Sequence, residues 1–118
     1  MQYHTDRTVE EIDELYERVS TQSSSKYPGM SYEDGVASVI QFLDGDLELD
    51  ELYENLKITF KDATLNTLDG VRFDWADSSW IHVRPSNTEP VVRIIGEAKE
   101  ENRINTIFDQ VRLTLNSQ

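Results

Sequence analysis

One stretch of the sequence gathers groups that could bind an anion. Residues 84–90 read Arg-Pro-Ser-Asn-Thr-Glu-Pro. The guanidinium of Arg84 offers a fork of N–H donors, and Ser86 and Thr88 add hydroxyl groups. The two prolines fix the backbone φ angle and stiffen both ends of the stretch. Converging donors on a stiff loop suit an oxyanion, and a phosphate in particular. The same residue types also fit an ordinary polar turn.

Two apolar runs flank this stretch and predict the strands that position it. Residues 80–83 and 91–95 are rich in β-branched and aromatic side chains, which favour strands. Arg84 then closes the first strand, and Arg93 lies early in the second. An antiparallel pairing of the two strands would bring both arginines to the loop.

Apolar periodicity predicts three helices in the remainder of the chain. They are expected over residues 9–20, 49–61 and 99–115. The first helix begins with a capping-box pattern, Thr8-Val9-Glu10-Glu11. The apolar face of the last helix is predicted to consist of Ile104, Ile107, Phe108, Val111 and Leu115.

Further strands are predicted over residues 36–42, 64–68 and 71–75. The first of these is less clear, because a helix starting at Tyr32 would also bury its apolar residues. In the last, Val71, Phe73 and Trp75 alternate with polar residues, which predicts a half-buried strand. The order strand, helix, several strands, helix predicts an α+β fold. We expect a small, mostly antiparallel sheet with helices packed on one face, plus an extra N-terminal helix.

A Ser-rich segment predicts a boundary inside the chain. Residues 21–26 read Thr-Gln-Ser-Ser-Ser-Lys, and a Pro-Gly pair follows at positions 28 and 29. We expect residues 1–30 to form a helix and a linker separable from the core, and residues 31–118 to form the main domain. Limited proteolysis should then cut first near residues 23–26.

The loop and its flanks resemble a known family. Residues 84–90, with Arg93 following, resemble the phosphate-binding loop in the C-terminal domain of the α-D-phosphohexomutases. These enzymes are the phosphoglucomutases, phosphomannomutases and phosphoglucosamine mutases. Residues 66–73, Asn-Thr-Leu-Asp-Gly-Val-Arg-Phe, look like the strand and turn that precede the loop in that family. Residues 94–101 look like the strand and helix start that follow it. The resemblance runs from about Asp62 to the last residue.

The resemblance implies a set of site residues and partners. Arg84, Ser86, Asn87, Thr88 and Arg93 would hold the phosphate group of a hexose phosphate. The remaining domains of a full-length mutase would be further partners. No catalytic residue and no metal ligand is expected in this chain, and magnesium is expected only in the full-length enzyme.

Two features of that family are missing from the sequence. The enzymes transfer a phosphoryl group through a phosphoserine beside a bound metal ion. The serines at 23–25 lack the His-Asn-Pro that follows the family's serine, and Asp44-Gly45-Asp46 fits a turn with a helix N-cap better than a metal loop. We therefore expect a domain that is inactive alone. The alternative is a free-standing interaction or regulatory module that keeps the fold without catalysis. A complete small enzyme would need a nucleophile–base pair that the sequence does not show.

Composition excludes several other classes of function. The 118 residues carry a net charge of −12, which disfavours nucleic acid and anionic membrane surfaces as partners. There is no cysteine, and the two histidines lie far apart in sequence, so a His/Cys metal site is not expected. The first residues lack the apolar core of a signal peptide, and a cytoplasmic location is the default expectation.

Overall fold

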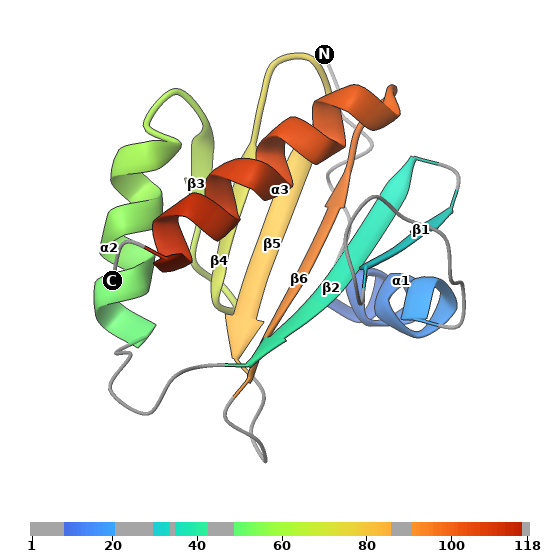
Figure 1. Cartoon of the computed structure of the whole chain (residues 1–118), viewed down its shortest axis with the longest axis horizontal. Coiled ribbons are helices and arrows are strands. Elements are labelled where there is room, and N and C mark those ends of the chain that lie inside the picture. The colour runs from blue at the N-terminus through green and yellow to red at the C-terminus, as the bar shows by residue number, and fades with distance from the viewer. Residues whose placement is uncertain (1–8, 21–29, 34, 43–48, 86–90, 117–118) are drawn as a thin grey trace.

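The computed structural model describes residues 9–20, 30–33, 35–42, 49–85 and 91–116 of the chain. It contains three helices and one antiparallel sheet within these residues (Figure 1). The helices are α1 Val9–Ser20, α2 Leu49–Thr59 and α3 Glu101–Asn116. The strands are β1 Met30–Glu33, β2 Val36–Phe42, β3 Thr64–Asn66, β4 Val71–Asp74, β5 Trp80–Pro85 and β6 Val91–Glu97.

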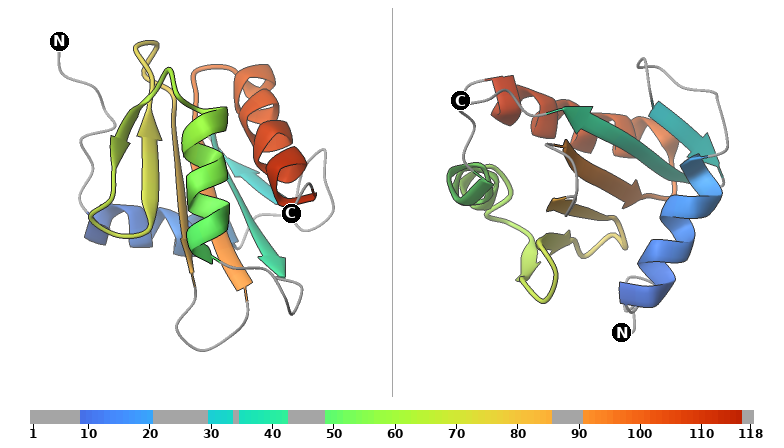
Figure 2. Two further views of the ribbon diagram at one scale, coloured as in Figure 1. Left: turned by 90° about the vertical axis from the view of Figure 1, so that its left-hand side faces the viewer. Right: turned by 90° about the horizontal axis from the view of Figure 1, so that it is seen from below.

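The sheet has six strands in the order β1-β2-β6-β5-β4-β3. Every neighbouring pair is antiparallel. Helices α2 and α3 pack side by side on one face, and α1 lies against the other (Figure 2). The predicted α+β fold with an extra N-terminal helix is therefore confirmed, and the two helices of the main domain share one face as expected.

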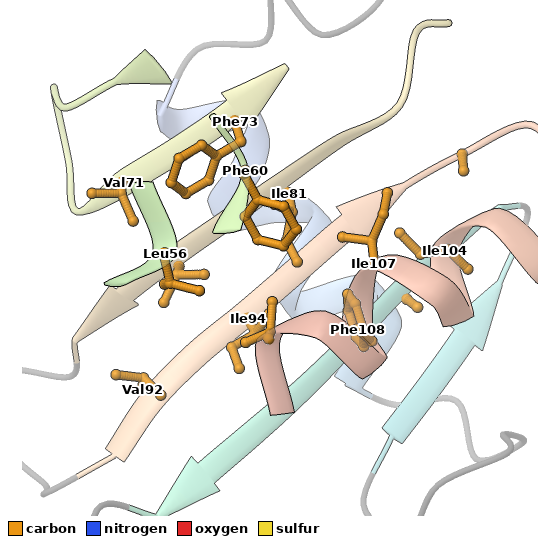
Figure 3. Packing of buried hydrophobic residues seen from close by; sticks show 14 of the residues in the cluster. Leu56, Phe60, Val71, Phe73, Ile81, Val92, Ile94, Ile104, Ile107 and Phe108 are labelled. Atoms are coloured by element: carbon orange, nitrogen blue, oxygen red, sulfur yellow. The ribbon is translucent and has the colours of Figure 1, made fainter. Parts of the chain in front are cut away.

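The larger core lies between the sheet and helices α2 and α3 (Figure 3). Residues spaced three and four apart put one apolar stripe of α3 on the sheet. The predicted face of α3 is confirmed: Ile104, Ile107, Phe108 and Val111 are buried, and Leu115 packs against them. The hydroxyl oxygens of Thr59 and Thr114 lie 3.1 Å apart and link α2 to α3.

A smaller core lies between the sheet and α1. It consists of Ile12, Leu15, Tyr16, Val36, Trp80 and Ile95. Successive side chains of a strand point to opposite faces, so β5 sends Ile81 to the larger core and Trp80 to the smaller one. The same alternation places every second residue of β5 and β6 under α1.

Several details differ from the sequence-based predictions. Helix α2 ends at Thr59 instead of residue 61, and α3 spans Glu101–Asn116 instead of residues 99–115. Strand β1 was not predicted; it is a four-residue edge strand paired with β2. Strand β3 ends at Asn66, short of the predicted residue 68. Arg72 was expected on an exposed surface, yet only 6% of it is exposed, because its guanidinium lies over the Trp80 ring and pairs with Asp74 at 3.1 Å.

Other predictions are settled or stay open. Residues 36–42 form a strand and not a helix, with seven residues in register against β6. The predicted capping threonine Thr8, the turn at 44–46 and the linker at 21–26 lie outside the described residues. The division of the chain at residue 30 stays a prediction. None of the described helices is long and apolar enough to cross a membrane.

Candidate functional site

The two arginines of the predicted site lie on neighbouring strands. Arg84 near the end of β5 pairs directly opposite Arg93 near the start of β6, as the spacing predicts. Residues directly opposite each other in an antiparallel pair project from the same face, with Cβ atoms roughly 5 Å apart. Two positive charges placed in this way repel each other, and a negative partner relieves that repulsion.

The loop between these strands carries the other predicted ligands. Strand β5 ends at Pro85 and β6 begins at Val91, so the loop joins the strand ends beside the arginine pair. Ser86, Asn87 and Thr88 lie outside the described residues. Of the five predicted phosphate ligands, the structure therefore places Arg84 and Arg93.

Arg84 contacts two carboxylates that sequence reasoning did not connect with it. Its Nη1 atom donates a hydrogen bond to Oδ1 of Asp13 on α1 and forms an ion pair with Oδ2 of Asp69 at 3.4 Å. The Asp69 carboxylate belongs to the turn between β3 and β4. Asp13 lies 71 positions from Arg84 in sequence, so no local pattern could reveal the contact.

Tyr16 attaches α1 to the two strands of the site. Its hydroxyl lies 3.2 Å from the carbonyl oxygen of His82 and 3.1 Å from that of Arg93, so one O–H is shared between β5 and β6. The Arg84 guanidinium lies 5.6 Å from the centre of the Tyr16 ring. Burial raises the pKa of Tyr16 well above its usual value, while the charges of Arg84 and Arg93 oppose that rise. The hydroxyl therefore stays protonated and donates.

His82 fixes the turn that carries Asp69. The ring is 2% exposed, and its Nε2 lies 2.6 Å from the carbonyl oxygen of Asp69. A carbonyl only accepts, so Nε2 carries the hydrogen and Nδ1 is the unprotonated nitrogen. Nδ1 is buried and has no hydrogen-bond partner among the described residues. Burial is the main cause that lowers the pKa of His82, which keeps the ring neutral at pH 7. The expectation that His82 is a sheet residue is confirmed.

Gly70 holds the same turn against β5. Its φ angle is +65°, and a Cβ atom there would clash with the carbonyl oxygen of Val83. Only glycine fits this close approach without strain. The predicted Asp69-Gly70 turn is thus held from two sides, which keeps the Asp69 carboxylate next to Arg84.

Two further side-chain contacts lie away from the arginine pair. Trp80 Nε1 donates to Glu97 Oε1 at 2.9 Å, and Arg103 Nε donates to Asp77 Oδ2 at 3.1 Å at the opposite end of β5 from the loop. Trp75 and Trp80 are buried core residues, so neither offers an exposed platform for a ligand. Among the described residues, no group of three or more His, Cys, Asp or Glu side chains gathers as a metal site would require.

Comparison with known proteins identifies the part of the chain that carries this site. Residues 33–114 match the family model described as phosphoglucomutase/phosphomannomutase, C-terminal domain. The match includes Arg84, Arg93 and all six residues of β5. Helix α1, with Asp13 and Tyr16, lies outside it.

Curated relatives match part of the chain. A probable phosphoglucosamine mutase of Methanothermobacter thermautotrophicus is 38% identical over 68 residues, which is 57% of this chain and 15% of the relative. A phosphopentomutase of Thermococcus kodakarensis is 41% identical over 49 residues, 42% of this chain and 11% of the relative. A phosphomannomutase of Methanocaldococcus jannaschii is 34% identical over 61 residues, 52% of this chain and 13% of the relative.

These relatives act on different sugars, according to their names, and each is far longer than the stretch it shares with this chain. The shared part therefore points to the domain and not to one substrate. Because the family model covers most of the sheet together with α2 and α3, the chain belongs to the family of phosphoglucomutase/phosphomannomutase C-terminal domains.

Proposed function

We propose that the chain is the phosphosugar-binding domain of a larger phosphohexomutase. In this proposal Arg84, Ser86, Asn87, Thr88 and Arg93 bind the phosphate group of a hexose phosphate during intramolecular phosphoryl transfer. The observation that carries it is the arginine pair, with Arg84 directly opposite Arg93 at the two strand ends that the loop joins.

The chemistry of the pair supports a phosphate ligand. Arginine binds phosphate oxygens through two parallel N–H donors, and such charge-assisted bonds are about twice as strong as neutral ones. A phosphate dianion placed between two guanidiniums would also remove the repulsion between Arg84 and Arg93. The hydroxyl and amide side chains of the loop, together with its backbone N–H groups, would supply the remaining donors.

The other parts of the reaction would come from the remaining domains of a full-length enzyme. By the family resemblance these supply a phosphoserine and a bound magnesium ion. The described residues do not form a metal-binding group, and we propose no step through a metal in this chain. The isolated chain should bind phosphate without mutase activity. A cytoplasmic location stays part of the proposal.

One observation favours the second candidate function, a free-standing regulatory module. Helix α1 lies outside the family-matched residues and contacts the proposed site directly through Asp13. The two functions differ in what is encoded next to the chain. A phosphoserine loop and a metal loop encoded upstream in the same reading frame would establish the mutase domain. Their absence there would favour the regulatory module.

The test of phosphate binding is a titration followed by NMR. Inorganic phosphate or glucose 1-phosphate is added to the wild-type chain at constant ionic strength. Binding should be weak, with a Kd of about 1 mM, or about −4 kcal/mol, because one domain supplies only part of a closed site. The backbone amide signals of Arg84, Ser86, Asn87, Thr88 and Arg93 should shift.

Two variants make the titration specific. Arg84→Ala should weaken binding about tenfold or more, since a hydrogen bond to a charged group contributes roughly 1.5–3 kcal/mol. Arg103→Ala is the matched control, because it removes the same charge at the opposite end of β5. Equal affinities in all three proteins would show that the loop is an ordinary turn.

A further inference from the structure

The proposed phosphate ligand Arg84 is already engaged by an anion from within the chain. Its Nη1 atom contacts the Asp13 carboxylate of α1 and lies 3.4 Å from the Asp69 carboxylate. Helix α1, which carries Asp13, lies against the face of the sheet opposite α2 and α3 (Figure 2). A phosphate that binds Arg84 must approach the same guanidinium and would be repelled by both carboxylates.

We propose that Asp13 is an internal competitor of the phosphate, so that docking of α1 and anion binding at Arg84 oppose each other. This inference rests on the proposed function, because it takes Arg84 to be a phosphate ligand. It assigns a regulatory role at that site to α1, and α1 lies outside the family-matched residues 33–114.

The two carboxylates differ in how firmly they are held. Asp69 belongs to a turn fixed by the His82 ring and by the close approach of Gly70 to β5. Asp13 lies on a separate helix, and its side chain is 50% exposed, compared with 36% for Asp69. Rotation of the Asp13 side chain into water therefore disturbs little else. Asp13 is the carboxylate that can leave when phosphate arrives.

Tyr16 couples the position of Arg84 to the docking of the helix. The Arg84 guanidinium lies over the Tyr16 ring, and the Tyr16 hydroxyl is bonded to the backbone of the strand that carries Arg93. A phosphate that draws Arg84 toward the loop takes its charge away from both Asp13 and the Tyr16 ring. Helix α1 then keeps its apolar contacts and the Tyr16 hydroxyl bonds but loses the ion pair between Asp13 and Arg84. By thermodynamic linkage, α1 docking weakens phosphate binding by the same factor by which phosphate binding weakens α1 docking.

The test compares phosphate affinity in two single-charge variants of the full chain. Asp13→Asn removes the competing charge at nearly constant size, and Glu14→Gln removes one charge from the next residue of α1, which is exposed. Asp13→Asn should bind inorganic phosphate about two- to fivefold more tightly than the wild type, as expected for a partly exposed ion pair. Glu14→Gln should bind as the wild type does.

A second measurement on the wild type does not depend on any variant folding. Amide signals of Ile12, Asp13 and Tyr16 should shift on phosphate addition with the same midpoint as that of Arg84. Equal gains in the Asp13 and Glu14 variants would reduce the effect to net charge and overturn the inference.

The outcomes separate the inference from the function on which it rests. Phosphate binding of equal strength in the wild type and Asp13→Asn, with no shifts in α1, would refute the competition while leaving the phosphate site intact. A lack of binding in all the proteins, Asp13→Asn included, would refute the phosphate site itself and the competition with it.

Discussion

The two faces of the sheet are built from alternate residues of the same strands, yet they differ in chemistry. Under α2 and α3 the strands present Val71, Phe73, Ile81, Val83, Val92 and Ile94, and this face is a continuous apolar core. Under α1 the intervening residues are Arg72, Asp74, Trp80, His82, Arg84, Arg93, Ile95 and Glu97. On this face apolar side chains lie among charged ones, and the ion pairs join Arg72 to Asp74 and Arg84 to Asp13 and Asp69.

The difference shows how the fold and the site can share a few strands. The apolar face holds the sheet together, because burial of apolar area is the dominant favourable term in folding. The α1 face leaves charged side chains in fixed positions on that rigid support. Arg84 follows Val83, so one residue anchors the strand in the apolar core and the next carries the charge that we propose binds phosphate. The predictions below test this division, beginning with the largest effect.

Two adjacent isoleucines allow the two faces of the sheet to be compared directly. Ile94 is 2% exposed in the larger core, and Ile95 is 0% exposed in the smaller one. Replacing a buried isoleucine with alanine costs about 2–5 kcal/mol of unfolding free energy, depending on how far the site can collapse. We expect Ile94→Ala in the upper part of that range and Ile95→Ala in the lower part, because α1 can move to fill the space. Urea unfolding of both variants measures the difference. A larger loss of unfolding free energy in Ile95→Ala than in Ile94→Ala would contradict the idea that the α2/α3 face holds the sheet together.

Two tyrosines provide a smaller comparison. The Tyr16 hydroxyl bonds to the backbone of β5 and β6, so Tyr16→Phe should lower the unfolding free energy by about 1 kcal/mol. The buried Tyr53 hydroxyl has no hydrogen-bond partner among the described residues, and burial raises the pKa of Tyr53 to about 12. Tyr53→Phe should therefore be neutral or slightly stabilising. Thermal or urea unfolding of the two variants provides the check. Equal losses of unfolding free energy would show that the Tyr16 hydroxyl bonds do not stabilise the fold.

His82 gives the α1 face a dependence on pH. Its folded-state pKa is lowered, mainly by burial, so the unfolded chain binds the proton more readily. Stability should then be highest with the ring neutral, and should fall as the pH drops through the ordinary histidine value of about 6.5. Urea unfolding between pH 7.5 and 5.5 measures this fall. His82→Gln should flatten the profile in that window. If the unfolding free energy of the wild type did not change between pH 7.5 and 5.5, the assignment of this pH dependence to His82 would be refuted.

Much of the fold is readable from the sequence because local periodicity carries it. Residues 9–20 and 36–42 were predicted with the bounds that the structure shows, and the apolar stripe of α3 follows from its spacing. The arginine pair was also predictable, since antiparallel strands joined by one loop bring their ends together.

The missed features depend on contacts between distant parts of the chain. Asp13 has an ordinary helix-surface spacing, and only the packing of α1 on the sheet brings it to Arg84. The burial of Arg72 follows from a tryptophan on the neighbouring strand. Strand β1 has four residues and is held extended by its pairing with β2. Its own sequence therefore indicates a strand only weakly.

The central claim is that Arg84 and Arg93 hold one phosphate together. The most direct test follows the side-chain Nε–H signals of both arginines during a titration with inorganic phosphate at constant ionic strength. Both signals should shift along one curve with a single Kd of about 1 mM, while the signal of Arg103 stays in place. Shifts of one arginine alone, or equal shifts of Arg103, would contradict the binding of one phosphate by Arg84 and Arg93.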